Sequence, residues 1–133
     1  MMTDGTYRIL LVEDDHAIAQ VIGIGMRQLG LPHTIDEAIS AEEGFDLWSQ
    51  QPYDLLVTDY NLRGTNGLTL IIQVREAWGD VPTVLFTAYD TPRLRNEARA
   101  AGVSVFLSKP FVIDDFVALA RQLLPVQMRA VGT

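Results

Sequence analysis

The sequence predicts an α/β fold in which a doubly wound, five-stranded parallel sheet lies between two layers of helices. Five short apolar segments alternate with five segments of helical character along the 133 residues. Parallel strands need crossover connections, and because these connections are right-handed, helices cover both faces of the sheet. Four of the apolar segments stop at polar side chains, and ligands of such folds bind beyond the carboxyl ends of the strands. We therefore expect a polar site at one edge of the sheet.

The composition restricts the classes of partner. The net charge is −7 and the pI is about 4.6, so the chain should repel nucleic acids and membranes with anionic surfaces. It has no cysteine, which excludes disulfides and thiolate metal sites. We expect no signal peptide, because the first residues carry no basic region and the next apolar run ends in acids. No apolar run reaches the roughly 20 residues of a spanning helix. We expect a cytoplasmic protein with one domain over residues 1–124 and a C-terminal tail, or the start of a linker, at 125–133.

The first elements follow from hydrophobic spacing and from residues that stop helices. Tyr7–Val12, rich in Ile, Leu and Val, is the first strand. A helix begins at Asp15 or His16, ends at Gly30 and cannot resume at Pro32. Its apolar side chains recur at helical spacing, at Ile18, Val21, Ile22, Met26 and Leu29.

Residues 34–57 predict a strand, a helix and a strand. Thr34–Ala38 carries two acids, which favours a strand at the edge of the sheet. Ser40 and Glu43 have the spacing of a capping box, and the helix that they begin should bury Phe45 and Trp48. The third strand, Leu55–Val57, follows Pro52.

The second half repeats the alternation. Asn66-Gly67 precedes a helix from about Leu68 to Trp78, and Val81-Pro82 leads to the strand Val84–Phe86. Thr91-Pro92 is typical of a helix start with proline at its first position. That helix should turn Leu94 and Ala98 inward and end at Gly102. The last strand is Val105–Ser108, and the last helix runs from Ile113 to Leu124 and stops at Pro125.

Three acids follow the first and third strands. Glu13, Asp14 and Asp59 would lie within a few ångströms of one another if those two strands are neighbours. Carboxylates that close raise one another's pKa unless a cation neutralises them. Mg²⁺, or Mn²⁺ in its place, fits because it uses few carboxylates and keeps several waters. The alternative is that Asp14, Asp15 and Asp59 only cap helices.

A lysine and a threonine end the other two strands. Lys109 needs a counter-charge, for which Asp59 is the obvious candidate, and the following Pro110 favours an extended bond that aims the ammonium at the sheet edge. A lysine that only snorkels to solvent is the simpler alternative. The hydroxyl of Thr87 could bind a phosphoryl oxygen on Asp59, although a lone threonine in a strand usually has no such role.

These motifs resemble the receiver domain of two-component response regulators, and the resemblance extends from Tyr7 to Leu124. It rests on Leu-Leu-Val-Glu13-Asp14-Asp15, Val57-Thr58-Asp59, Phe86-Thr87-Ala88 and Lys109-Pro110-Phe111. It implies a flavodoxin-like sheet of strand order 2-1-3-4-5 with five helices. The resemblance also implies that Asp59 is the phospho-acceptor and that Lys109 pairs with the phosphoryl group. Mg²⁺ would be bound directly by Asp14, Asp59 and the backbone carbonyl of Asn61, and through water by Glu13. Thr87 and Phe106 would be the switch pair.

By the same resemblance, the donor is the phosphohistidine of a sensor histidine kinase or a phosphotransfer protein. Transfer would be in line to Asp59, with charge on the equatorial oxygens offset by Mg²⁺ and Lys109. The acyl phosphate would attract the Thr87 hydroxyl, and Phe106 would turn into the space left behind. This would change the surface made by the helix after Thr91-Pro92, the strand Val105–Ser108 and the last helix.

Two departures from the family pattern affect the site. Many receivers have a proline soon after the acceptor, whereas this chain reads Asn61-Leu62-Arg63-Gly64, with a cation close to the site. Phe106 replaces the commoner tyrosine and makes no hydroxyl contact. Asn61 and Tyr89 are candidates for setting the lifetime of the phosphoryl group. Because Tyr89 could shield it from water, we expect slow self-dephosphorylation.

Two other functions compete with this interpretation. A phosphatase of the haloacid dehalogenase type would use Asp59 as nucleophile, but it needs a general acid where this chain has Asn61. A receiver-like interaction module without phosphotransfer would not need the intact set of acids, Thr87 and Lys109. We therefore expect a regulatory phospho-acceptor that assists only its own phosphorylation and dephosphorylation, not an enzyme.

The last helix suggests an interface. Its side chains Phe116, Leu119, Ala120 and Leu123 should face the core, and Ile113, Val117 and Leu124 form a second apolar line. The preceding helix offers three arginines and the last helix two acids, at Arg93, Arg95, Arg99, Asp114 and Asp115. Apolar lines rimmed by charge mark interfaces, so this face could pair two copies of the chain. The alternative is one broad buried face with solvated charges around it.

Overall fold

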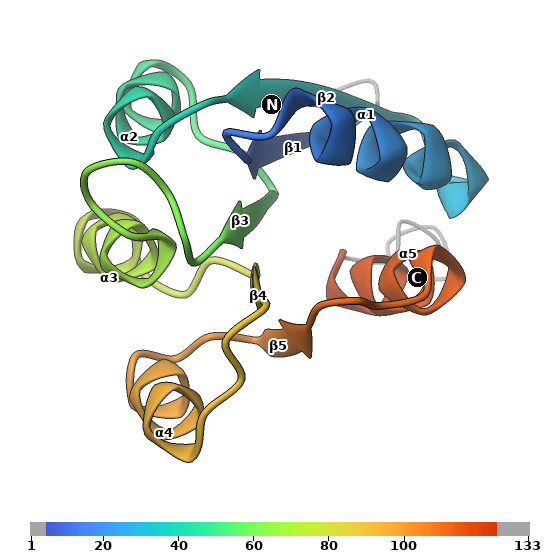
Figure 1. Cartoon of the computed structure of the whole chain (residues 1–133). Helices are drawn as coiled ribbons and strands as arrows, with labels where there is room; N and C mark the ends of the chain where they lie inside the picture. The colour runs from blue at the N-terminus through green and yellow to red at the C-terminus, as the bar shows by residue number, and fades with distance from the viewer. Residues whose placement is uncertain (1–4, 125–133) are drawn as a thin grey trace, which may run out of the picture.

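All strands of the sheet are parallel, in the order β2-β1-β3-β4-β5 (Figure 1). The computed structural model describes residues 5–124. Its strands are β1 (Tyr7–Val12), β2 (His33–Ala38), β3 (Leu55–Asp59), β4 (Thr83–Thr87) and β5 (Val105–Ser108). The predicted strand order is confirmed, and β2 forms the expected edge. The predicted tail at 125–133 lies outside the described residues.

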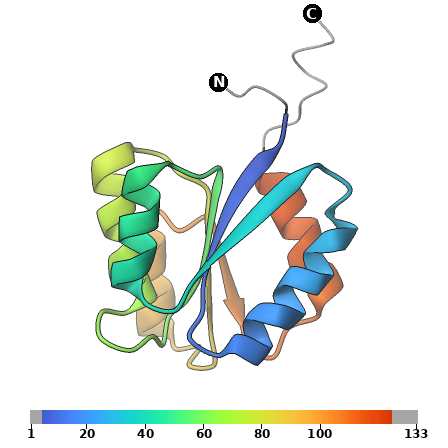
Figure 2. The same cartoon turned by 90° about the horizontal axis from the view of Figure 1, so that it is seen from above.

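Helices cover both faces, which gives the predicted three layers. They are α1 (His16–Gly25), α2 (Ala41–Gln50), α3 (Gly67–Trp78), α4 (Pro92–Ala100) and α5 (Ile113–Leu123), with a 3₁₀ turn η1 (Met26–Leu29) after α1. Helices α1 and α5 lie on one face of the sheet, and α2, α3 and α4 lie on the other (Figures 1 and 2). Within residues 5–124, no helix is both long enough and apolar enough to cross a membrane.

Alternate residues of each strand serve two separate cores. In β1, Ile9 and Leu11 pack in the core under α1 and α5, whereas Leu10 and Val12 pack in the core under α2, α3 and α4. All four are buried. Strands buried on both faces read as continuous apolar runs, which is why the sequence of β1 shows no polar alternation.

Short polar side chains cap four of the helices, as the sequence indicates. Asp15, Ser40, Asn66 and Thr91 each accept hydrogen bonds from backbone N–H groups of the first turn that they precede. The capping box differs in one contact, since Glu43 accepts from the N–H of Ile39 at 2.8 Å. These caps satisfy donors that an α-helix leaves free at its start.

The predicted burial is wrong for Val21 on α1 and is met only in part for Phe45 on α2. Val21 is 54% exposed, because the buried face of α1 is formed by Ala19, Ile22 and Gly25, and Val21 lies about 100° from Ile22 around the helix. Phe45 is only partly buried, and its ring meets the edge of Trp78 with centroids 5.6 Å apart. Trp48 is fully buried, as predicted.

The second apolar line predicted for α5 is also mostly buried. Val117 is 3% exposed and Leu124 is 2% exposed, and Ile113 is partly buried against the same core. Phe116 and Ala120 are fully buried. Helix α5 therefore has one broad buried face, and an exposed apolar line cannot be the basis of a dimer here.

Candidate functional site

The three acids meet at the carboxyl ends of β1 and β3. These strands pair directly, with Val12 opposite Thr58, so the residues that follow them emerge side by side. Glu13, Asp14 and Asp59 each offer a carboxylate oxygen within 4.8 Å of the other two. Glu13 and Asp59 are 3% and 4% exposed. The sequence-based prediction of an acidic cluster is confirmed.

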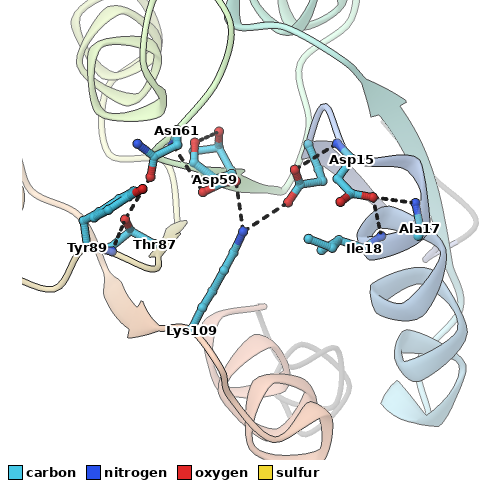
Figure 3. Close-up of polar contacts among 10 residues, drawn as sticks. Asp15, Ala17, Ile18, Asp59, Asn61, Thr87, Tyr89 and Lys109 are labelled. Carbon is cyan, nitrogen blue, oxygen red and sulfur yellow. Dashed lines mark hydrogen bonds and ion pairs between the residues drawn. The ribbon is translucent and has the colours of Figure 1, made fainter.

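The ammonium of Lys109 points from the end of β5 to these acids (Figure 3). Its Nζ donates to Asp59 Oδ2 at 3.0 Å and lies 3.6 Å from Glu13 Oε1. The ammonium also lies 5.0 Å from the ring centroid of Phe86. The Lys109-Pro110 peptide bond is cis, and the Lys109 N–H donates to the carbonyl of Thr87 at 2.7 Å. Lys109 is thus paired with the expected counter-charge rather than snorkelling to solvent.

Glu13 is the acid whose protonation is most affected by the site. Burial raises its pKa to about 7, the neighbouring charge of Asp59 adds to the rise, and the backbone N–H of Asp15 and the ammonium of Lys109 oppose it. Its Oε2 accepts from that N–H at 3.1 Å. Its Oε1 is buried and has no hydrogen-bond donor among the described residues. A buried acceptor without a donor, beside two more carboxylates, fits a hard divalent cation such as Mg²⁺.

The backbone around Asp59 holds the carboxylate in place. The Asn61 N–H donates to Asp59 Oδ1 at 3.2 Å, and the Thr58 hydroxyl donates to the Asp59 carbonyl at 2.9 Å. Gly67 begins α3 against that carbonyl, where a Cβ atom would overlap it. Glycine is needed here because of this close approach, which the sequence suggested only as a chain break.

Only one of the three proposed helix caps is a cap. Asp15 caps α1 by accepting from Ala17 and Ile18, at 2.9 Å and 3.3 Å. Asp14 instead lies 3.9 Å from Nε of Arg63, the exposed cation of the loop after β3. Asp14 and Asp59 therefore belong to the acidic cluster, and the capping alternative is wrong for both.

The hydroxyl of Thr87 does not contact Asp59 in this structure. It donates to Asn61 Oδ1 at 3.2 Å and accepts from the Tyr89 N–H at 3.0 Å. Figure 3 shows Thr87 and Asn61 side by side next to Asp59. The side-chain contact with Asn61 was not foreseen, because it depends on the placement of the loop after β3.

Two aromatic residues flank this arrangement. Phe106 on β5 is partly buried against the core of α2, α3 and α4, and the guanidinium of Arg95 lies 4.7 Å above its ring centroid. Tyr89 is 64% exposed. Sequence reasoning gave no role to Arg95 in the position of Phe106.

Comparison with known proteins identifies the family. A family model described as the response regulator receiver domain matches residues 9–121. The chain belongs to the response regulator receiver family. This receiver is 33% identical over 117 residues to the transcriptional regulatory protein QseB of Haemophilus influenzae. The matched region covers 88% of this chain and 52% of QseB. It is 31% identical over 112 residues to the cell cycle transcriptional regulator CtrA of Caulobacter vibrioides, which covers 84% and 47%.

Solved receivers have the same fold. The non-phosphorylated HemR receiver domain from Leptospira biflexa superposes with a TM-score of 0.81 at 26% identity, covering 91% of this chain and 96% of that one. A response regulator from Chloroflexus aurantiacus superposes with a TM-score of 0.80, also at 26% identity. The superposition covers 89% of this chain and 97% of that one. The chain spans about half the length of the curated relatives it matches. The family match favours a two-component receiver over a phosphatase of the haloacid dehalogenase type.

Proposed function

We propose that this receiver accepts a phosphoryl group on Asp59 and stores it as a regulatory signal. The observation that carries the proposal is the juxtaposition of a buried Asp59 with Lys109 at 3.0 Å and with two further acids. Phosphoryl transfer needs positioning and charge compensation more than covalent chemistry. A buried carboxylate with a fixed ammonium and a cation site supplies both.

In the proposed reaction, an oxygen of Asp59 bonds to phosphorus while the N–P bond of a phosphohistidine breaks. The electron pair of that bond returns to the imidazole nitrogen. Mg²⁺ or Mn²⁺, when held directly by Asp14, Asp59 and the Asn61 carbonyl and through water by Glu13, supplies positive charge to the phosphoryl oxygens. Lys109 moves its hydrogen bond from the carboxylate to a phosphoryl oxygen.

The proposed switch starts at Thr87. An acyl phosphate presents strong acceptor oxygens beside β4, and the Thr87 hydroxyl would exchange Asn61 Oδ1 for one of them. The hydrogen bond from the Tyr89 N–H would be lost in this movement. Phe106 would then turn into the vacated space and change the surface of α4, β5 and α5. This biases an existing equilibrium between two arrangements.

Asn61 and Tyr89 are proposed to set the lifetime of the phosphoryl group. Hydrolysis needs a water in line with the Asp59–phosphorus bond. Tyr89, exposed beside the site, could close that approach. The side-chain amide of Asn61 cannot take a proton from that water as a general base. We therefore expect a lifetime well above seconds in Mg²⁺ buffer, and a half-life of only seconds would contradict this part of the proposal.

The proposed donor is the phosphohistidine of a sensor histidine kinase or a phosphotransfer protein, in the cytoplasm. We also propose that the domain occupies residues 1–124 and makes no direct contact with nucleic acid or membrane, in line with its charge of −7. A homodimer through α4, β5 and α5 would have to rest on the charged groups of this surface, because the second apolar line of α5 is buried.

The test is phosphorylation by acetyl phosphate in Mg²⁺, measured by intact mass. Wild type should gain one phosphoryl group and Asp59→Asn none. Asp54→Asn is the matched control, because Asp54 lies before β3 and accepts from the Arg8 N–H at the other end of the sheet. Equal labelling of wild type and Asp59→Asn would refute the assignment. No labelling of wild type would favour an interaction module without phosphotransfer.

A further inference from the structure

A polar network outside the acidic site joins the loop after β4 to α4 and β5. Asp90, in that loop, accepts from Arg95 on α4 at Nε, 2.5 Å, and at Nη2, 2.7 Å. The hydroxyl of Ser108, at the end of β5, also donates to Asp90. Paired N–H donors from a guanidinium fix its plane and direction, which a lysine could not do.

The network fixes the guanidinium over the ring of Phe106. The distance from Arg95 Cζ to the ring centroid is 4.7 Å, and Nη2 also lies 3.5 Å from Ser108 Oγ. The hydrogen bonds from Arg95 and Ser108 hold the pKa of Asp90 below its usual range, so the carboxylate remains charged at neutral pH. A cation over an aromatic face is attracted to it, and here the cation cannot follow the ring if the ring moves.

We propose that Arg95, held by Asp90 and Ser108, is a latch that keeps Phe106 in its resting position and so sets how readily the domain switches. The proposal rests on the proposed function, in that it presumes a phosphoryl group on Asp59. Arg95 is a positioning residue, because it acts through Phe106 and not through a contact with the acidic cluster of Glu13, Asp14 and Asp59.

Two contacts of the resting arrangement conflict with the proposed switch. If Phe106 turns toward Thr87, its ring leaves the guanidinium above it. If the Thr87 hydroxyl moves toward Asp59, it breaks the hydrogen bond from the Tyr89 N–H, which fixes the loop next to Asp90 in the resting arrangement. Interactions present only in the resting arrangement lower the apparent affinity for any ligand that requires the other one. Removing the latch must therefore strengthen the binding of a phosphoryl mimic.

The experiment titrates beryllofluoride with Mg²⁺ into the whole chain and follows the fluorine NMR signal of the bound species. Arg95→Gln should reach half-saturation at a beryllofluoride concentration about two- to fivefold lower than wild type, the range expected from an exposed cation–aromatic contact. Arg93→Gln is the matched control. It removes the same charge from the same helix, where Arg93 pairs, among residues 5–124, only with Glu97, at 3.4 Å. Its half-saturation should equal that of wild type.

The direction of the change in half-saturation separates the latch from a general effect of the substitution. Loss of a positive charge weakens binding of an anion, and loss of a packing contact weakens any folded site, whereas the latch predicts tighter binding. Arg95→Gln should at the same time lower the unliganded melting temperature. Added salt should narrow the difference in melting temperature between Arg95→Gln and wild type. The side chains of Arg95 and Asp90 are 48% and 30% exposed, so salt screens the attraction between them.

Three results would overturn the proposal. Half-saturation of Arg95→Gln at the wild-type concentration or above it would show that no latch exists. An equal shift in Arg93→Gln would assign the effect to bulk charge. If wild type itself failed to bind beryllofluoride, the proposed phospho-acceptor function would fail, and the latch with it, which distinguishes the two failures.

Discussion

Replacing Glu13 with glutamine tests how the acidic cluster controls its cation. Burial and the charge of Asp59 raise the pKa of Glu13 to about 7, so the carboxyl is about nine-tenths protonated at pH 6 and about one-tenth at pH 8. A cation binds the ionised form. Wild type should therefore bind Mg²⁺ about tenfold more tightly at pH 8 than at pH 6. Glu13→Gln should bind more weakly at pH 8 and lose most of this dependence.

Calorimetric titration of Mg²⁺ in two buffers with different ionisation enthalpies measures the effect. Binding to wild type should release about one proton at pH 6 and about a tenth of one at pH 8, and binding to Glu13→Gln should release almost none at either. Glu37→Gln is the matched control, since Glu37 is exposed on β2. Equal proton release at pH 6 by wild type and Glu13→Gln would refute the assignment of this titration to Glu13.

The same group affects stability without the cation. Because the folded pKa of Glu13, about 7, lies above its ordinary value of 4.5, the folded state holds the proton more tightly. The wild-type free energy of unfolding should therefore fall as pH rises from about 4.5 to about 7, by on the order of 3 kcal/mol at most. Urea unfolding in EDTA should show this fall in wild type and not in Glu13→Gln. A parallel pH dependence in both would contradict it.

Three further predictions concern packing and charge. Gly67→Ala should lower the free energy of unfolding by about 1–3 kcal/mol, since its Cβ would overlap backbone, whereas Gly23→Ala, with open space around it, should raise it by up to about 1 kcal/mol. Lys109→Gln should lower the free energy of unfolding in EDTA by no more than about 3 kcal/mol, because the lysine side chain is 22% exposed. Urea titrations with Mg²⁺ should show that the cation restores part of this loss. Val117→Thr should lower the thermal midpoint through a buried hydroxyl, whereas Val21→Thr should leave it nearly unchanged.

The fold and the acidic cluster could be predicted because they depend on local patterns and on one topological rule. Buried strands read as apolar runs, caps read as single polar residues, and parallel strands bring their carboxyl ends to one edge. Glu13 and Lys109 stand immediately beyond such ends, and Asp59 is the last residue of β3. Their meeting therefore follows from strand order and needs no knowledge of loop conformation.

The errors arose where orientation depends on geometry beyond the local pattern. Helical spacing placed Val21 inward, but the buried face of α1 is formed by Ala19, Ile22 and Gly25, and Val21 lies at the edge of this face, where it is exposed. On α5, spacing could not say how much of the helix circumference its neighbours cover. Its contact with η1 and the sheet buries Val117 and Leu124. These are tertiary effects that periodicity does not encode.

The contacts of Asn61 link the proposed storage of a signal at Asp59 with its proposed transmission through Thr87. Its backbone N–H holds Asp59 Oδ1, and its side-chain oxygen holds the Thr87 hydroxyl. A change of the Asn61 side chain keeps the N–H to Asp59 but removes the partner of the Thr87 hydroxyl, so any effect on the proposed lifetime of the phosphoryl group comes together with a change in the resting position of Thr87. The hydrogen bond from Tyr89 to Thr87 is donated by the backbone N–H, which every residue but proline provides. A change of the Tyr89 side chain can thus alter access of water without altering that hydrogen bond, so lifetime and switching are separable at Tyr89 and not at Asn61.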